Sequence, residues 1–228
     1  MNAVKSVAAR VSLAIVVALI VLLTIFPSLD LGISTLFFTP DTGFTIDGVW
    51  YERMVYRSVQ YLLILVGLGL LLMWVNGRRL APEATKLISG RQLVFLLLLL
   101  ALGPGLLVNE GMKENWGRSR PVDLLQFGGD KTFSPAFVFS DQGGKSFPSG
   151  HAAAAFYLVA VAFVVVPRRR LWLWLAFGYG VLVGGMRVAS GGHFLSDVVT
   201  SVLVVWLMTI VLYRLVFGRM PAWSDDKA

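Results

Sequence analysis

Residues 187–217 read RVASGGHFLSDVVTSVLVVWLMTIVLYRLVF, a short polar cluster followed by a long apolar run. The apolar run covers residues 194–217, and about 20 mostly apolar residues suffice for a helix to cross a bilayer. Arg187 and His193 lie in the polar cluster, and Asp197 lies at the start of the apolar run. This stretch therefore predicts a transmembrane helix with ionisable residues gathered near one membrane surface.

Five further apolar runs precede this one and set the fold class. The six runs lie at about residues 11–29, 56–75, 93–108, 152–166, 171–186 and 194–217. Hydrophobic residues make up 57% of the 228 residues and charged residues only 14%, whereas soluble domains carry roughly a quarter charged residues. This composition excludes an ordinary soluble globule and a disordered chain. We predict an all-α, polytopic membrane protein with six transmembrane helices, forming a single domain over residues 1–228.

The distribution of Lys and Arg predicts the orientation of these helices. With the N-terminus in the cytoplasm, twelve of the 20 basic residues fall inside and eight outside, while ten of the 13 acidic residues fall outside. Basic loops favour the cytoplasmic side, and the triplet at residues 168–170 is the strongest anchor. We expect both termini inside, the long segments at about 30–55 and 109–150 outside, and the run at 11–29 retained as the first helix.

Charge and composition also exclude several kinds of site. The net charge of +7 is explained by basic loops that orient the chain, so we expect no nucleic-acid partner. The sequence has no cysteine, which excludes disulfides and thiolate metal sites. Its two histidines, His151 and His193, are too few for a zinc site of three histidines.

Asp197 follows His193 by four residues, so the two share a face if both are helical. A carboxylate in that position accepts a hydrogen bond from one ring nitrogen and leaves the other as a nucleophile or base. The alternative is a capping pair at a helix start, where an acidic residue is favoured by the helix dipole.

Lys113 and Arg120 are seven residues apart, on one face if helical, and Pro121 ends the element. Two cations there suit a phosphate, because Arg offers a planar fork and Lys a point charge. The alternative is a pair of interfacial cations whose stems cover apolar surface.

Pro148, Ser149, Gly150 and His151 precede an alanine-rich helix. The first amides of a helix bind anions. Ser149 would add a donor or cap the helix, and His151 would stand where a leaving oxygen needs a proton. The alternative is an ordinary capped loop.

Together these residues resemble the three signature motifs of the phosphatidic acid phosphatase type 2 superfamily, here at residues 113–121, 148–151 and 187–197. The resemblance implies a metal-independent hydrolase without a cofactor, which removes phosphate from a membrane lipid through a phosphohistidine. By position, His193 would be the nucleophile, Asp197 its orienting partner and His151 the general acid. The groups expected to bind the phosphate are Lys113, Arg120, Ser149, Gly150 and Arg187. Met186 departs from the family, which usually has serine there.

The resemblance leaves the substrate open. Residues 122–147 are similar to bacterial lipid A phosphatase-type members, which implies a bacterial inner membrane. The predicted orientation then makes the site face the periplasm. The candidates are phosphatidic acid, phosphatidylglycerophosphate, undecaprenyl diphosphate and lipid A. A phosphotransferase that passes the phosphoryl group to a lipid acceptor is the first alternative, and a non-catalytic lipid transporter or binding protein is the second. The expected partners are a lipid phosphate and the bilayer, and the oligomeric state is open.

Overall fold

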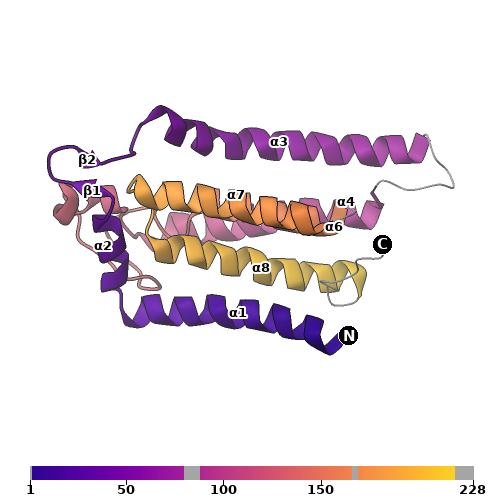
Figure 1. The fold of residues 1–228 in the computed structure, drawn as a ribbon, viewed down its shortest axis with the longest axis horizontal. Helices are drawn as coiled ribbons and strands as arrows, with labels where there is room; N and C mark the ends of the chain where they lie inside the picture. Colours follow the sequence, from indigo (N-terminus) through magenta and orange to yellow (C-terminus); the bar gives the residue numbers. More distant parts are fainter. Residues whose placement is uncertain (1, 80–87, 166–168, 219–228) are drawn as a thin grey trace.

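The computed structural model describes residues 2–79, 88–165 and 169–218. Its long helices run along one axis and pack against one another, as Figure 1 shows. They are α1 (Asn2–Ile25), α3 (Trp50–Arg79), α4 (Gly90–Leu100), α6 (Gly150–Val165), α7 (Arg169–Ala189) and α8 (Leu195–Phe217). The predicted helical membrane fold is confirmed. The basic residues Lys86, Arg168, Arg219 and Lys227 and the acidic residues Glu83, Asp225 and Asp226, used to predict the orientation, lie outside the described residues.

Judged by length and composition, fewer helices qualify as membrane spans than the six predicted. Among the described residues, four helices are long and apolar enough to cross a membrane, and a bent pair makes a fifth. The helix α6 is apolar but only 16 residues long. Six spans therefore stay a prediction.

The first apolar run does not form one straight helix, contrary to the prediction for residues 11–29. After α1 the chain turns by 94° into α2 (Ser28–Thr35). The break falls at Pro27, which lacks an N–H and whose ring clashes with the preceding helical turn. In Figure 1, α2 crosses the end of the bundle. It carries Asp30, which is fully buried there.

The helix α4 continues into a wider π-helix, η1 (Ala101–Lys113), and one last turn, α5 (Glu114–Trp116). Pro104 lies inside this segment, and its carbonyl accepts a hydrogen bond from the side-chain amide of Asn109 at 2.7 Å. Gly117 ends the helix in the left-handed conformation, with φ of 74°. The helix therefore ends before Pro121, where the sequence predicted its end, and Arg120 is extended.

A cap of short elements covers this end of the bundle. It contains the hairpin of β1 (Phe38–Thr39) and β2 (Gly43–Phe44) and the 3₁₀ helices η2 (Pro121–Asp123) and η3 (Leu125–Phe127). Phe38, Phe44 and Phe127 pack edge to face, with ring centroids 5.1–5.4 Å apart. The all-α prediction therefore needs one amendment, the hairpin, which joins the first outer segment to the second.

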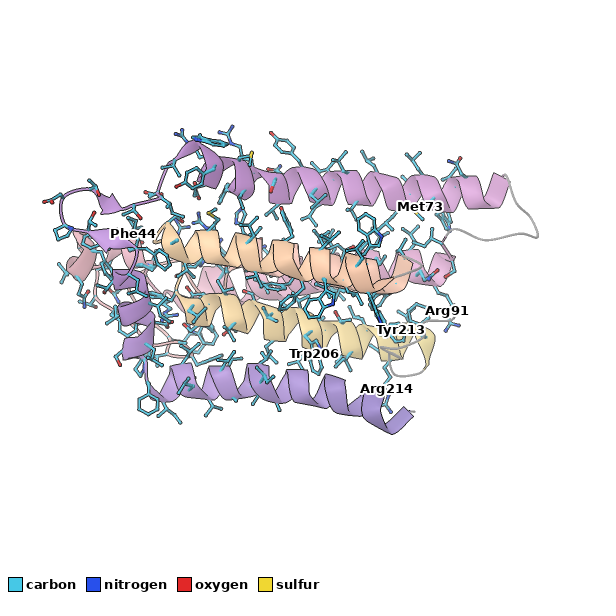
Figure 2. All side chains as sticks on the ribbon, in the orientation of Figure 1. Phe44, Met73, Arg91, Trp206, Tyr213 and Arg214 are labelled. Atoms are coloured by element: carbon cyan, nitrogen blue, oxygen red, sulfur yellow. The ribbon has the colours of Figure 1, made fainter. Side chains whose placement is uncertain are left out.

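The main apolar core fills the opposite half of the bundle. Phe95, Leu96 and Leu99 of α4 are fully buried there, beside Tyr213 of α8. Figure 2 shows Tyr213, Met73 and Arg91 far from Phe44 of the hairpin. The cap and the main apolar core thus occupy different ends of the molecule.

Candidate active site

The three predicted motifs meet at the capped end of the bundle. Lys113 ends η1, His151 lies in the first turn of α6, Arg187 lies in the last turn of α7, and His193 precedes α8. Figure 1 shows these helix ends beside α2 and the hairpin. The charges of Lys113, Arg120 and Arg187 interact electrostatically with one another and with His151. Those of Arg187 and Lys113 also reach His193.

The ring of His193 is held by the backbone. Its Nδ1 lies 2.7 Å from the carbonyl oxygen of Ser146, and the side chain is almost fully buried. A carbonyl only accepts, so Nδ1 carries the proton and Nε2 is left with a free lone pair. Burial lowers the pKa of His193, and the Asp197 carboxylate opposes this shift. The neutral, nucleophilic form is therefore favoured.

Asp197 lies close to His193 but faces other donors. Its Oδ2 is 3.5 Å from Nδ1 of the imidazole, farther than the Ser146 carbonyl. The same oxygen accepts hydrogen bonds from the backbone N–H of Phe194 at 2.8 Å and from the Ser146 hydroxyl at 2.5 Å, while Oδ1 pairs with Arg118. Asp197 thus caps α8, as the alternative interpretation had it, and also touches the residue that orients His193.

Arg187 is only partly used by protein partners. Its Nη1 donates to Glu52 of α3 at 2.9 Å, and its guanidinium carbon lies 5.0 Å from the centre of the Tyr56 ring. Its buried Nε has no partner among the described residues. The backbone then turns sharply, and the N–H groups of Gly192 and His193 both donate to the Arg187 carbonyl at 3.0 Å. A partly exposed guanidinium whose charge reaches both histidines suits an anionic ligand.

The imidazole of His151 stacks on Tyr56, with centroids 3.9 Å apart. Ser149 is fully buried, and its hydroxyl accepts from the N–H of Ala152 at 3.4 Å, which is the capping role. Gly150 opens α6, where an added Cβ would lie 2.3 Å from the side-chain oxygen of Asn109. The contributions of Ser149 and Gly150 to phosphate binding stay predictions.

The sequence interpretation assigned no site role to Glu52, Tyr56, Ser146 or Asp30. Glu52 and Tyr56 lie at the N-terminal end of α3, and Glu52 is a buried carboxylate beside an apolar run. Ser146 lies two residues before Pro148, in the loop leading to the second motif. Glu52 and Asp30 are both acidic residues close to the end of a predicted span, and this position was the feature of the sequence that could have indicated a site role.

Met186, the departure from the family pattern, is half-buried in an apolar cluster. It packs against the buried cluster that Val55 and Val59 of α3 form with Ala155 of α6 and Val183 of α7. A thioether there adds apolar contact between three helices where serine would offer a hydroxyl.

The sequence is similar to those of known phosphatases. The sequence profile of the PAP2 superfamily matches residues 92–221. The chain is 34% identical over 211 residues to the lipid A 4'-phosphatase of Francisella tularensis subsp. novicida (strain U112), covering 86% of this chain and 89% of that protein. It is 30% identical over 229 residues to the lipid A 4'-phosphatase of Rhizobium leguminosarum, covering 92% and 95%.

A solved structure supports the fold. The crystal structure of a transmembrane PAP2-type phosphatidylglycerolphosphate phosphatase from Bacillus subtilis matches this chain with a TM-score of 0.53 and covers 94% of each chain. The sequences are 23% identical, so the likeness concerns the fold.

Proposed function

This chain belongs to the PAP2 superfamily and is a membrane lipid phosphatase, and we propose that its substrate is lipid A, from which it hydrolyses a phosphate monoester. The observation that carries the activity is the meeting of both histidines with Lys113, Arg120 and Arg187 at one end of the bundle. The choice of lipid A rests on the similarity to the lipid A 4'-phosphatases over most of each chain.

In the first step of the proposed reaction, Nε2 of His193 bonds to phosphorus and the bond from phosphorus to the lipid oxygen breaks. His151 gives its proton to that oxygen as the alcohol leaves. Lys113, Arg120 and Arg187 hold the phosphoryl oxygens, where preorganised donors stabilise the transition state most. The dianionic phosphate supplies the negative charge that favours a protonated His151 among these cations.

In the second step, water attacks the phosphorus of the phosphohistidine. His151, now neutral, takes a proton from that water, the N–P bond breaks and inorganic phosphate leaves. His193 returns to its neutral form with Nδ1 still bound to the Ser146 carbonyl. A lipid alcohol in place of water would make the enzyme a phosphotransferase.

The finer topology is also part of the proposal. We place all six apolar runs in the membrane as one domain, with both termini in the cytoplasm and the site at the periplasmic face of a bacterial inner membrane. The excess of basic residues on the predicted inner side supports this orientation. α6 is short for a span, but flanking polar residues at the headgroups extend its reach.

The test is phosphate release from a panel of lipid phosphates by the purified protein in detergent with a chelator present. We expect the highest kcat/KM on lipid A, with lower values on phosphatidic acid, phosphatidylglycerophosphate and undecaprenyl diphosphate. His193→Ala removes the nucleophile and abolishes release, whereas Gln126→Ala, at an exposed position of η3, retains it. Equal release by His193→Ala and wild type would overturn the assigned nucleophile, and a faster reaction on a glycerophospholipid would overturn lipid A as substrate.

A further inference from the structure

Arg118 is a fully buried cation to which the motif-based mechanism gives no task. Its Nη2 donates to Asp30 at 2.9 Å, and its Nη1 donates to the Ser196 hydroxyl at 2.8 Å and pairs with Asp197. Its Nε donates to the backbone carbonyl of Ser134 at 2.9 Å. The guanidinium therefore joins α2, the outer loop and the start of α8 in one buried network.

Aromatic rings close this network from the sides. The guanidinium carbon of Arg118 lies 4.2 Å from the ring centre of Phe194, and the rings of Phe133 and Phe147 lie 5.6 and 5.9 Å away. With every nitrogen bonded to protein and no exposed surface, Arg118 is not placed to bind a phosphate. Its role differs from that of Arg187, whose Nε is unpaired within the described chain.

Asp30 of α2 binds Arg118 and the start of α8. Its Oδ1 accepts the backbone N–H of Ser196 at 3.0 Å, and its Oδ2 accepts both the Ser196 hydroxyl and Nη2 of Arg118. Both carboxylates in this network, Asp30 and Asp197, are fully buried. Buried charges of this kind persist only when paired and hydrogen-bonded. Burial raises the pKa of Asp30 and Arg118 opposes this shift, and the same guanidinium pairs with Asp197.

We propose that Arg118 and Asp30 are positioning residues of the phosphatase, which fix the Asp197 carboxylate and through it the nucleophile His193. The contacts form a continuous sequence from Asp30 to Arg118, to Asp197 and to the Ser146 hydroxyl. The Ser146 carbonyl then holds the imidazole. This inference rests on the proposed function. It gives α2, the short helix that follows the bend at Pro27, a part in positioning the nucleophile.

The geometry explains why arginine is required. A planar fork reaches two carboxylates and a carbonyl at once, whereas the point charge of lysine does not. Loss of this alignment weakens the attack by His193 and leaves the phosphate-binding cations untouched. We therefore expect Asp30→Asn and Arg118→Lys to lower kcat by about 10- to 100-fold and to change the Ki of inorganic phosphate by less than about twofold.

The test is a double-mutant cycle on kcat for lipid A, using wild type, Asp30→Asn, Asp197→Asn and the double variant. If Asp30 acts through Asp197, its substitution lowers kcat about tenfold in wild type and less than about twofold in the Asp197→Asn background. Ser196→Ala is the milder variant, and we expect it to show the same pattern with a loss of about two- to fivefold. Rates are referred to the folded fraction of each preparation.

Two control variants separate positioning from stability. Leu96→Ala removes a fully buried side chain in the opposite half of the bundle, so it lowers the melting temperature without lowering kcat per folded molecule. Asp47→Asn changes an exposed carboxylate of the same outer segment and leaves kcat unchanged. Equal losses for Asp30→Asn with and without Asp197, or a Ki for phosphate that rises in parallel, would overturn the positioning role. A wild type that releases no phosphate from any lipid would overturn the proposed function itself, and this inference with it.

Discussion

A hydrogen bond to a backbone carbonyl, rather than to a carboxylate, fixes the tautomer of His193. The Ser146 oxygen takes the Nδ1 proton at 2.7 Å, and Asp197 acts from 3.5 Å away as a charge. A backbone carbonyl does not titrate, so this hydrogen bond persists at any pH at which the loop is folded. The loop therefore orients the imidazole of His193, and Asp197 of α8 stabilises the positive charge that forms on it.

This environment predicts the pH dependence of the nucleophile. Burial lowers the pKa of His193 below its ordinary value of 6.5, and only the neutral form, which predominates above the pKa, attacks phosphorus. The acidic limb due to His193 in the profile of kcat/KM therefore lies below pH 6.5. The chain has two histidines, so His151→Gln leaves one imidazole, whose nitrogen NMR shifts report the pKa directly. Titration at or above pH 6.5 would contradict the assignment.

Gly192 leaves room for the guanidinium of Arg187. A Cβ added at this position would lie 1.9 Å from Nη2 of Arg187, so Gly192→Ala displaces the charged group from the site. Loss of one charge-assisted hydrogen bond to phosphate costs about 1.5–3 kcal/mol, so we expect the Ki of inorganic phosphate to rise at least about tenfold. The matched control is Gly185→Ala in α7, where a Cβ would meet nothing within 4 Å. Equal phosphate affinity in both variants would show that Arg187 does not bind the anion.

The site residues that could be predicted from the sequence were those that lie at fixed spacings within the three motifs. The motif positions, such as Lys113 and Arg187, came from their order in the sequence. Residues that pair between distant segments had no such spacing, because Arg118 and Asp30 are 88 residues apart in the sequence and Arg187 and Glu52 are 135 apart. Such contacts arise only when helices far apart in sequence end at the same membrane face.

At the scale of elements, α7 meets its neighbours through glycines. A Cβ at Gly180 would lie 2.7 Å from the Phe156 ring of α6, and one at Gly184 would lie 2.6 Å from Cγ1 of Val198 in α8. Small residues four apart let transmembrane helices approach closely. This packing holds the end of α7, with Arg187, against the start of α8, with Asp197.

Substitution at this contact tests the packing. Gly184→Ala forces Val198 aside, and overpacking of this kind costs about 1–3 kcal/mol, so the melting temperature in detergent falls by several degrees. Gly178→Ala in the same helix meets nothing within 4 Å, and alanine is the better helix former by about 1 kcal/mol. We expect that control to melt no lower than wild type. Identical melting temperatures for both variants would show that the glycine contact does not stabilise the bundle.

The elements that followed from hydropathy are the long apolar helices, such as α3 and α8. The bend at Pro27 and the early end of α5 at Gly117 were not predicted, because apolar character continues past Pro27 and the cation spacing suggested a helix up to Pro121. Both breaks depend on single residues with special backbone properties. The β-hairpin was missed because its strands are two residues each, too short for any alternation to be read.

At the scale of the whole molecule, the proposed orientation makes a prediction for chemical labelling. The chain has no cysteine, so single cysteines report topology directly. Gln126→Cys, exposed on η3 in the second outer segment, reacts with an impermeant maleimide in intact spheroplasts. Asn76→Cys, exposed near the other end of α3, reacts only after permeabilisation. The opposite labelling pattern would place the site in the cytoplasm.

The most direct test of the central claim is to trap the phosphoenzyme. Wild type, His193→Ala and Gln126→Ala are mixed with lipid A carrying radiolabelled phosphate and quenched in alkali within a single turnover. We predict protein-bound, acid-labile label in wild type and Gln126→Ala and none in His193→Ala, because Nε2 of His193 is the only atom assigned to bond to phosphorus. Label that persists in His193→Ala, or full turnover by wild type without bound label, would contradict the account.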